Sequence, residues 1–413
     1  MVLIIALADK LKLYLTFGRL NGNYTFMIKR PLWIKQIEAS WRERPIVWFS
    51  GVRRVGKTSI AKMFESNVYL NCDLPSTLRQ LEDSELFFKS QKKGAVIILD
   101  EVHRLHDPSR VLKIAADAFP SLRILATGSS TLHATRKFRD SLTGRKWTIY
   151  LPPVLWDECL ENFDERDLDK RMLHGGLPEP LLAGHKNPDF FGEWLDSYYA
   201  RDISELFSVR DRSGFLSLLK LLLFQSGGLI DITKLASEAG VSRPTVKAHM
   251  EAMAVAHAIF PLTPFHGNGR REIVRRPKIY AFDTGFVTFV RGWNSLRDED
   301  RGLLWEHLVL DTLRAAGYGS HIGYWRDKNG REIDFVLRRE RDCVDTIECK
   351  MDPNRFDSSS LEEFRRLYPK GNNWLVSPQI DAAFLRRLKN LDVRFISTRH
   401  ILENKLTGKQ KSQ

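Results

Sequence analysis

Uninterrupted apolar runs mark the first third of the chain. "IVWF" (46–49) and "VIIL" (96–99) contain no polar residue, and "LRILA" (122–126) contains a single arginine. Such runs are typical of strands that are buried on both faces of a parallel sheet. Because helical spacing follows them, we predict a three-layer α/β domain in which helices cover both faces of the sheet.

Helical spacing continues through the middle of the chain and ends in a hairpin. "DITKLASEAGVSRPTVKAHMEAMAVA" predicts a helix over 232–239, a turn at Gly240, and a second helix capped by Ser242 with Pro244 in its first turn. This is the plan of a helix-turn-helix. "AIFPLTPFHGNGRREIVRRPKIYAF" then predicts a β-hairpin with a Gly-Asn-Gly tip, so the two parts together predict a winged helix.

The last hundred residues combine segments with helical spacing and segments with strand-like patterns. "RGLLWEHLVLDTLRAAG" predicts an amphipathic helix, "HIGYWRDKNGREIDFVL" a hairpin that turns at Asn329 and Gly330, and "CVDTIECK" a further strand. A helix in "SSLEEFRRLYP" and a strand in "NNWLVSP" follow. This order of elements predicts a second, smaller α/β domain.

The composition of the chain also predicts a class of partner and a cellular compartment. The 413 residues carry a formal net charge of +13, which favours a polyanionic partner, and nucleic acid before an anionic membrane. The four cysteines have neither zinc-site nor disulfide spacing, as expected of reduced thiols in a cytoplasmic protein. The apolar start "MVLIIALA" is too short to span a bilayer, and we expect residues 1–26 to be an extension and no membrane to be a partner.

The loop after the first apolar run has the pattern of a phosphate-binding loop, G-x-x-x-x-G-K-[ST]. Gly51 and Gly56 allow backbone N–H groups to turn toward phosphates, and the helix that begins at Lys57 adds the positive end of its dipole. Lys57 would reach the β- and γ-phosphates of ATP, and the Thr58 hydroxyl would bind Mg²⁺. The predicted ATP-binding residues of this loop are Gly51, Val52, Arg53, Arg54, Val55, Gly56, Lys57, Thr58 and Ser59.

Two acids end the second apolar run. Asp100 would hold the Mg²⁺ of ATP, and Glu101 would orient and deprotonate the attacking water. Thr127, at the end of the third run, is expected to contact the γ-phosphate or the water, with a helix cap as the alternative. Arg145 is a candidate arginine finger for the ATP of a neighbouring subunit, with a solvated or DNA-facing charge as the alternative. With Lys57, these residues form the predicted catalytic set.

Taken together, the motifs resemble a known family. "GVRRVGKTS", "ILDEVHRL", "ATGSS", "SLTGR", "HGGLPEPL", "RRPKIYAFDTG", "REIDFVL" and "TIECK" are similar to prokaryotic AAA+ ATPases with a C-terminal winged helix and a nuclease-like domain, which are related to archaeal initiator-type and STAND ATPases. The resemblance covers nearly the whole chain after Met27. It implies that Gly176 and Pro178 lie in a helical lid beside the adenine of ATP. The residues alone also allow a helix stop and a proline-led restart there.

The predicted winged helix is rich in basic residues. We expect its recognition helix and hairpin to contact DNA through Arg243, Thr245, Lys247, Arg270, Arg271, Arg275 and Arg276. His249 lies among the polar positions of the same helix, and Lys278 stands beside the arginines of the hairpin. Such a cluster would grip phosphates without reading sequence. The alternative is a winged helix that serves only as a packing or lid element.

The last domain carries an Asp…Glu-x-Lys pattern. Glu348 and Lys350 are two residues apart on a predicted strand, so they project from one face of it. Together with Asp334 they match the PD-(D/E)xK, or restriction-endonuclease-like, core. Asp334 and Glu348 would bind a divalent metal, Lys350 would activate water or steady the phosphate, and Glu306 would be a further ligand or an outer acid. The alternative is a fold kept for DNA binding alone.

These observations predict a segment order and a function. The segments are an extension (1–26), an AAA+ ATPase core (27–152), a helical lid (153–214), a winged helix (215–292), a nuclease-like domain (293–400) and a tail (401–413). The predicted function is an ATPase that uses ATP and Mg²⁺ to act on DNA as a motor or remodeller, self-associates, and carries a candidate nuclease site. A STAND-like ATP-switched signalling protein and a DNA-binding regulator with an inactive nuclease fold remain open.

Overall fold

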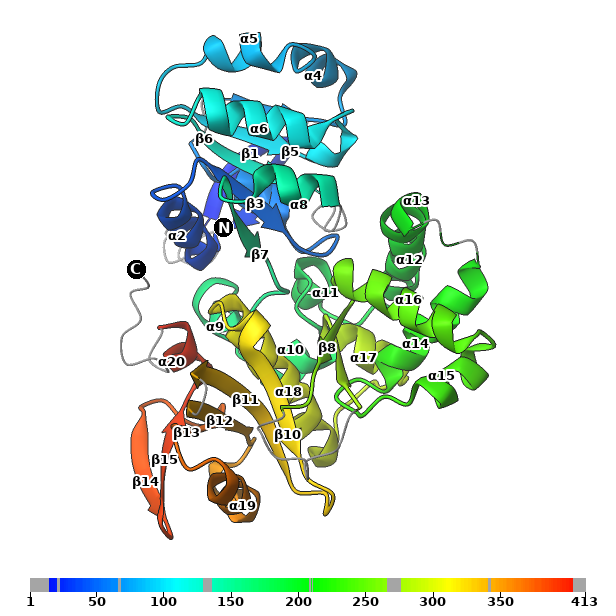
Figure 1. Ribbon diagram of the computed structural model, residues 1–413, viewed down its shortest axis with the longest axis vertical. Helices are drawn as coiled ribbons and strands as arrows, with labels where there is room; N and C mark the ends of the chain where they lie inside the picture. The colour runs from blue at the N-terminus through cyan, green and yellow to red at the C-terminus, as the bar shows by residue number, and fades with distance from the viewer. Residues whose placement is uncertain are drawn as a thin grey trace, which may run out of the picture. The chain divides into compact units, whose positions relative to one another are not determined.

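The computed structural model describes residues 15–20, 23–65, 68–128, 136–207, 209, 211–265, 276–340 and 343–403. The chain divides into two compact units. The first comprises Met1–Leu151 and Glu158–Arg166, and the second comprises Pro152–Asp157 and Asp167–Gln413 (Figure 1). None of the helices in the described ranges combines the length and the apolar character that crossing a bilayer requires.

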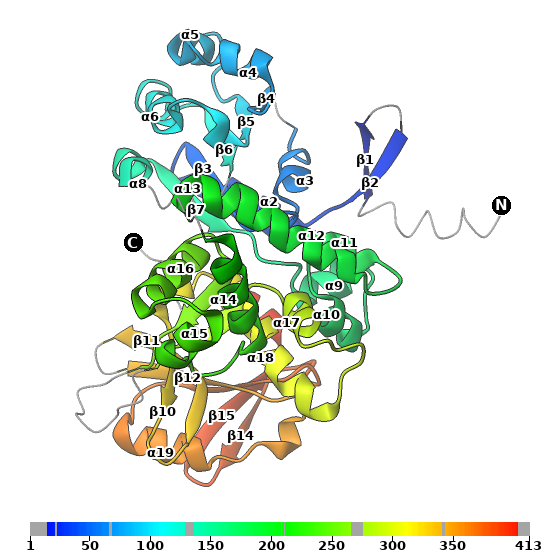
Figure 2. The same cartoon turned by 90° about the vertical axis from the view of Figure 1, so that its right-hand side faces the viewer.

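A parallel sheet forms the centre of the first unit, with strands in the order β4-β5-β6-β3-β7. Its strands are β3 (Ile46–Ser50), β4 (Val68–Asn71), β5 (Val96–Asp100), β6 (Arg123–Thr127) and β7 (Lys146–Tyr150). Helices α6 and α8 lie on one side of it and α3 on the other (Figure 2). Because both faces are covered, the three central strands are almost wholly buried, and the predicted α/β domain on a parallel sheet is confirmed.

Proline, aspartate or glycine stands at the start of five helices of this unit. They are α2 (Pro31–Ser40), α3 (Lys57–Ala61), α4 (Pro75–Gln80), α5 (Ser84–Lys89) and α6 (Pro108–Ala118), and the unit also contains η1 (Val102–Arg104) and α8 (Arg136–Leu142). Asp83 and Asp107 accept backbone hydrogen bonds at the starts of α5 and α6. A hairpin of β1 (Leu15–Leu20) and β2 (Asn23–Ile28) precedes them, and α9 (Trp156–Asn162) spans the point at which the chain returns to this unit.

Helices dominate the first half of the second unit. They are α10 (Leu168–His174), α11 (Pro178–Leu182), α12 (Pro188–Tyr198), the π-helical η2 (Tyr199–Ile203), α13 (Ser204–Phe207), α14 (Arg212–Phe224), α15 (Ile232–Ala239), α16 (Arg243–Val255) and α17 (Thr284–Val290). Between α16 and α17, β8 (Ile259–Leu262) pairs antiparallel with β9 (Lys278–Ala281). Helix α15 has the predicted bounds, Gly240 ends it with a φ of +67°, and Ser242 caps α16.

A mixed sheet closes the chain, in the order β10-β11-β12-β13-β15-β14 (Figure 1). Its strands are β10 (Ile322–Arg326), β11 (Glu332–Glu340), β12 (Cys343–Cys349), β13 (Asn373–Val376), β14 (Phe384–Leu388) and β15 (Leu391–Ile396). The associated helices are α18 (Asp298–Ala315), η3 (Gly319–His321), η4 (Pro353–Arg355), α19 (Ser359–Leu367) and α20 (Thr398–Leu402). The predicted order of helix, strands, helix and strand is present, but the prediction ended at β13 and missed β14 and β15. Strand β14 is an exposed edge strand without apolar–polar alternation.

The predicted segments map unevenly onto the two units. The predicted end of the ATPase core at residue 152 lies next to the point, after Leu151, where the chain enters the second unit. Residues 158–166 of the predicted lid belong to the first unit, and the rest of that lid lies in the second. The predicted winged-helix and nuclease-like segments lie together in the second unit.

Candidate functional site

The phosphate-binding loop joins β3 to α3 in a conformation that needs its glycines. Gly51 has a φ of +153° and Gly56 a φ of +103°. A Cβ atom on Gly51 would lie 2.6 Å from the Leu151 carbonyl oxygen, so no other residue fits there. The two glycines therefore determine the path of the loop.

Lys57 and Thr58 begin α3 with their polar groups at the loop. The Lys57 ammonium donates to the carbonyl oxygens of Gly51 (2.7 Å) and Val52 (2.9 Å). The Thr58 hydroxyl donates to Asp100 Oδ2 over 3.0 Å, which joins the start of α3 to the end of β5. A hydroxyl beside a carboxylate is an oxygen donor set that suits Mg²⁺.

Two further hydroxyls hold the Asp100 carboxylate. Tyr69, on β4, donates to Oδ2 over 2.6 Å, and Thr127, on β6, donates to Oδ1. Burial, followed by the hydrogen bond to Asp100, raises the pKa of Tyr69. Thr127 is fully buried and also accepts a hydrogen bond from the Glu101 N–H over 3.1 Å. Its hydroxyl thus holds the acidic pair, whereas the sequence predicted a contact with phosphate or water; Tyr69 was missed because nothing marks it in "VYLN".

Glu101 leaves β5 in a left-handed conformation, with a φ of +58°. Its carboxylate lies 3.2 Å from Nδ1 of His103. Burial raises the pKa of Glu101, but the hydrogen bond to His103 and the charges of Lys57, His103 and Arg53 outweigh it, so the pKa is lowered. His103, interpreted from sequence as a nearby polar residue without a catalytic part, is therefore the side chain that holds the proposed base.

Arg145 lies away from the phosphate-binding loop. It directly precedes β7, whose first residue pairs with the first residue of the parallel strand β3, whereas the loop follows the end of β3. Its guanidinium forms a two-point ion pair with the Asp117 carboxylate, in which Nη2 lies 3.0 Å from Oδ2. A finger role would require it to leave Asp117 and reach another copy of the chain.

A buried ion pair lies behind the loop. The Arg30 guanidinium donates to both carboxylate oxygens of Glu158, over 2.8 and 2.6 Å, and to the Val55 carbonyl oxygen of the loop over 3.2 Å. The Trp33 indole adds a hydrogen bond to Glu158 over 3.0 Å. Both charged side chains are 3% exposed. The sequence does not reveal this pair, because 128 residues separate its members.

The "GGLPEP" turn packs within the second unit. The Gly176 N–H donates to the Asp283 carboxylate over 2.6 Å, and the Gly176 carbonyl oxygen accepts from the Val154 N–H over 2.7 Å. A Cβ atom on Gly175 would collide with Asp283. Both backbone groups of Gly176 are thus used inside the protein, and Pro178 is the first residue of α11, as in the alternative of a proline-led restart.

Asp334, Glu348 and Lys350 meet, as the Asp…Glu-x-Lys pattern predicts. The Lys350 ammonium lies 3.1 Å from Glu348 Oε2 and 3.7 Å from Asp334 Oδ2. The Cys349 N–H fixes Asp334 Oδ2 over 2.8 Å. The lysine therefore faces the two carboxylates that were predicted to bind a metal.

Burial and mutual repulsion make it unfavourable for all the carboxyl groups of this cluster to be charged. Burial and the neighbouring Asp334 charge raise the pKa of Glu348 to about 8, against the opposing effect of Lys350. The same two causes raise the pKa of Glu306 to about 7, against Lys278 and a hydrogen bond from Tyr280. Carboxyl groups crowded in this way gain from a cation.

The cluster fits a metal ion with few protein ligands. Within the described residues, no three His, Cys, Asp or Glu side chains are grouped so as to hold a metal ion. Mg²⁺, however, keeps several waters and is commonly bound through one or two carboxylates, which Asp334 and Glu348 can supply. The Lys350 side chain is 32% exposed and so has room to turn from them.

The predicted DNA-binding residues divide into three groups. Arg243 and Lys247 are exposed on α16, and Thr245 is half-buried with its hydroxyl 2.7 Å from that of Ser242. Arg276 forms an ion pair with Asp231 over 2.9 Å. Arg270, Arg271 and Arg275 lie outside the described residues.

Two positions grouped with these residues need correction. His249 is buried against Phe215, and burial lowers its pKa, because it lies on the inner face of α16. Lys278 is only 4% exposed and binds the Glu332 carboxylate, so it is not part of a solvent-facing basic wing. Residue type alone does not distinguish these two buried positions from exposed ones.

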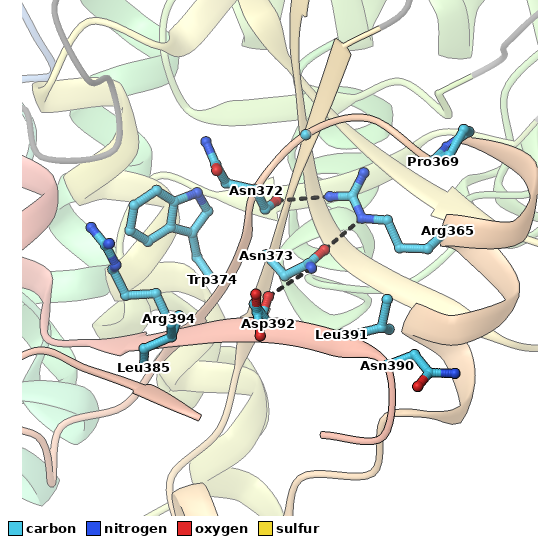
Figure 3. A pocket seen from close by; sticks show the side chains of 11 residues that line it. Arg365, Pro369, Asn372, Asn373, Trp374, Leu385, Asn390, Leu391, Asp392 and Arg394 are labelled. Atoms are coloured by element: carbon cyan, nitrogen blue, oxygen red, sulfur yellow. Dashed lines mark hydrogen bonds between the residues drawn. The ribbon is translucent and has the colours of Figure 1, made fainter. Parts of the chain in front are cut away.

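A surface pocket of about 650 Å³ lies beside β13 and β15 (Figure 3). The Arg365 guanidinium donates to Asn373 Oδ1 over 2.6 Å and to the Asn372 carbonyl oxygen over 2.8 Å. Arg394 lies over the Trp374 ring, 5.4 Å from its centroid. None of the predicted site residues lines this pocket. Its Arg365 links α19 to the segment that leads into β13.

Comparison with known proteins finds three family matches along the chain. Residues 43–160 match the family described as AAA domain. Residues 165–297 and 301–391 match two families described as domains of unknown function, DUF8612 and DUF4143. The first match, the parallel sheet and the phosphate-binding loop identify the first unit as a P-loop ATPase domain of the AAA+ type.

Two relatives that match about 70% of this chain are uncharacterized proteins. An uncharacterized protein of Mycobacterium tuberculosis, Rv2008c, is 26% identical over 306 residues, which are 71% of this chain and 67% of that protein. An uncharacterized protein of Methanocaldococcus jannaschii, MJ1544, is 25% identical over 321 residues, 70% of each. Among solved structures, RuvB of Thermotoga maritima aligns with 55% of this chain and 87% of its own at 18% identity and a TM-score of 0.28.

Proposed function

We propose that this chain is a Mg²⁺-dependent ATPase that acts on DNA as a motor or remodeller and carries a metal-dependent nuclease site. The observation that carries the ATPase part is the grouping of Thr58, Asp100 and Glu101 beside the phosphate-binding loop. The match of residues 43–160 to the AAA domain supports it. The net charge of +13 and the cluster of Asp334, Glu348 and Lys350 support DNA as the partner.

In the proposed reaction, the loop backbone and Lys57 bind the phosphates of ATP. Lys57 must exchange the Gly51 and Val52 carbonyl oxygens for phosphate oxygens, a short movement for a side chain already at the loop. Thr58 and Asp100 would hold Mg²⁺, which when bound offsets the charge of the transferred phosphoryl group.

Glu101 accepts the proton of the attacking water. Its lowered pKa keeps the carboxylate charged and able to act as a base at neutral pH. Two contacts hold it: His103 on the carboxylate and Thr127 on the backbone N–H. Lys57→Ala should abolish ATP binding, whereas Glu101→Gln should bind ATP without turnover.

At the second site, Asp334 and Glu348 would hold a divalent metal, which lowers the pKa of bound water and offsets phosphate charge. Lys350 then turns from the two carboxylates to the phosphate of the DNA backbone. Exposed Arg243 and Lys247 would hold DNA without reading its sequence.

The test combines ATP turnover with DNA cleavage. Purified wild-type protein is incubated with linear, circular and branched DNA and Mg²⁺ or Mn²⁺, with and without ATP. The variants Lys57→Ala and Lys350→Ala are assayed in parallel. DNA-stimulated turnover that needs Lys57 and cleavage that needs Lys350 would support both parts. Bound nucleotide with hardly any turnover, unchanged by DNA, would point to a STAND-like switch. DNA that is bound but left intact would point to a regulator with an inactive nuclease fold.

A further inference from the structure

A buried tyrosine from the β8–β9 hairpin reaches the carboxylate cluster. The Tyr280 hydroxyl donates to Glu306 Oε2 over 2.8 Å. Tyr280 is wholly buried, and it lies in the segment predicted as a winged helix, 26 residues before Glu306. The outer acid of the proposed metal site is thus hydrogen-bonded by a residue from outside the predicted nuclease-like domain.

The surroundings of Tyr280 leave its hydroxyl little freedom. Its backbone pairs with Phe260 of β8. Its ring lies edge-on to the imidazole of His307, with centroids 5.0 Å apart, and 5.9 Å from the ring of Phe335 on β11. Packing on these sides fixes the ring, and the ring in turn fixes the direction of the hydroxyl.

A hydrogen-bonded chain locks the strand of Tyr280 to the helix of Glu306. The Ala281 N–H donates to the Ser226 hydroxyl over 2.6 Å, and that oxygen lies 2.7 Å from Nε2 of His307. Ser226 is 1% exposed and His307 is 3% exposed. Buried polar groups that are satisfied in this way rigidify the elements that carry them.

A second side chain of β9 reaches the same region. Lys278 is two residues from Tyr280, so both project from one face of the strand. The Lys278 ammonium binds Glu332 on β11, and Glu332 also accepts from Arg326 over 2.7 Å. One strand thus brings a hydroxyl to α18 and an ammonium to the strand that carries Asp334.

We propose that the metal site of the C-terminal region is composite, with Tyr280 as a positioning residue that holds Glu306 toward Asp334 and Glu348. This inference rests on the proposed function, because it assumes that a divalent ion binds Asp334 and Glu348. Outer hydrogen bonds to the acids of a metal site commonly change metal affinity 10- to 100-fold. The hairpin of the predicted winged helix is then part of the site and not only a neighbour of it.

The test measures Mn²⁺ binding to the full-length protein by titration calorimetry. Tyr280→Phe keeps the ring and removes the hydroxyl, and we expect its dissociation constant for Mn²⁺ to rise about tenfold. Tyr324→Phe is the matched control, because that buried tyrosine hydroxyl donates to the Arg276 carbonyl oxygen and not to an acid. Equal melting temperatures would show that both variants are folded.

A double-mutant cycle separates positioning from a general structural effect. If Tyr280 acts through Glu306, Tyr280→Phe should add little to the loss of affinity caused by Glu306→Gln. If the wild type binds Mn²⁺ and Tyr280→Phe binds it with the same affinity, the inference is wrong but the proposed function stands. Fully additive losses in the double variant would have the same meaning. A wild type that binds no Mn²⁺, with Glu348→Gln behaving identically, would overturn the metal part of the proposed function and the inference with it.

Discussion

The Arg30 guanidinium and the Glu158 carboxylate form a two-point ion pair, over 2.8 and 2.6 Å, while the third arm of the arginine holds the Val55 carbonyl oxygen of the phosphate-binding loop. Glu158 lies where the chain returns to the first unit from the second. The loop is therefore held from behind by a contact between the beginning and the end of the ATPase unit.

Arg30→Ala should destabilise the protein by about 3–5 kcal/mol, because it leaves the Glu158 carboxylate buried without its cation. Denaturant titration measures the loss, and ATP affinity should fall as well since the loop loses a contact. Arg212→Ala is the matched control: its ion pair with Asp196 is more than half exposed, and its loss should cost less than about 1 kcal/mol. Equal losses for the two arginines would contradict a special role for Arg30.

His103→Ala should slow ATP turnover about 10- to 100-fold without weakening ATP binding, because the variant removes the side chain that holds Glu101. Steady-state turnover and nucleotide binding separate the two effects. The exposed His106, three residues on, provides the control His106→Ala. Weakened ATP binding with unchanged kcat in His103→Ala would assign His103 to the nucleotide and not to the base.

His307 should make the fold sensitive to acid. Burial lowers its pKa from 6.5 to about 4, so between these values the unfolded chain binds a proton that the folded chain excludes. Stability therefore falls as pH falls through this window, by about 3 kcal/mol for the full shift. Urea titrations at pH 7 and pH 4 should show a smaller acid loss for His307→Gln than for the wild type. The exposed His185, changed to Gln, should retain the wild-type loss.

Removing both exposed cations of α16, as Arg243→Ala with Lys247→Ala, should weaken DNA binding and reduce the slope of log K against log salt by about 2. Fluorescence anisotropy over a salt series measures the slope. Lys220→Ala, an exposed lysine on α14, is the control. An unchanged slope in the double variant would place the DNA surface on other elements.

Elements whose cause lies in neighbouring residues were predictable from the sequence alone. The apolar runs at 46–49 and 96–99 became buried parallel strands, the glycines of the phosphate-binding loop have positive φ, and α15 has its predicted bounds. In each case the neighbouring residues contain the physical cause, which is periodicity, a cap or the lack of a Cβ. The match of residues 43–160 to the AAA domain agrees with this local reading.

Tertiary structure decided which side chains share a site and which are buried. His249 and Lys278 are polar residues but are buried, because burial depends on which other elements pack against that face of the helix or strand. Thr127 holds Asp100, Arg145 binds Asp117, and Tyr280 binds Glu306 through contacts that no spacing rule connects. A sequence thus determines its own turns and periods, whereas a hydrogen bond between distant residues exists only once the sheets and helices have packed.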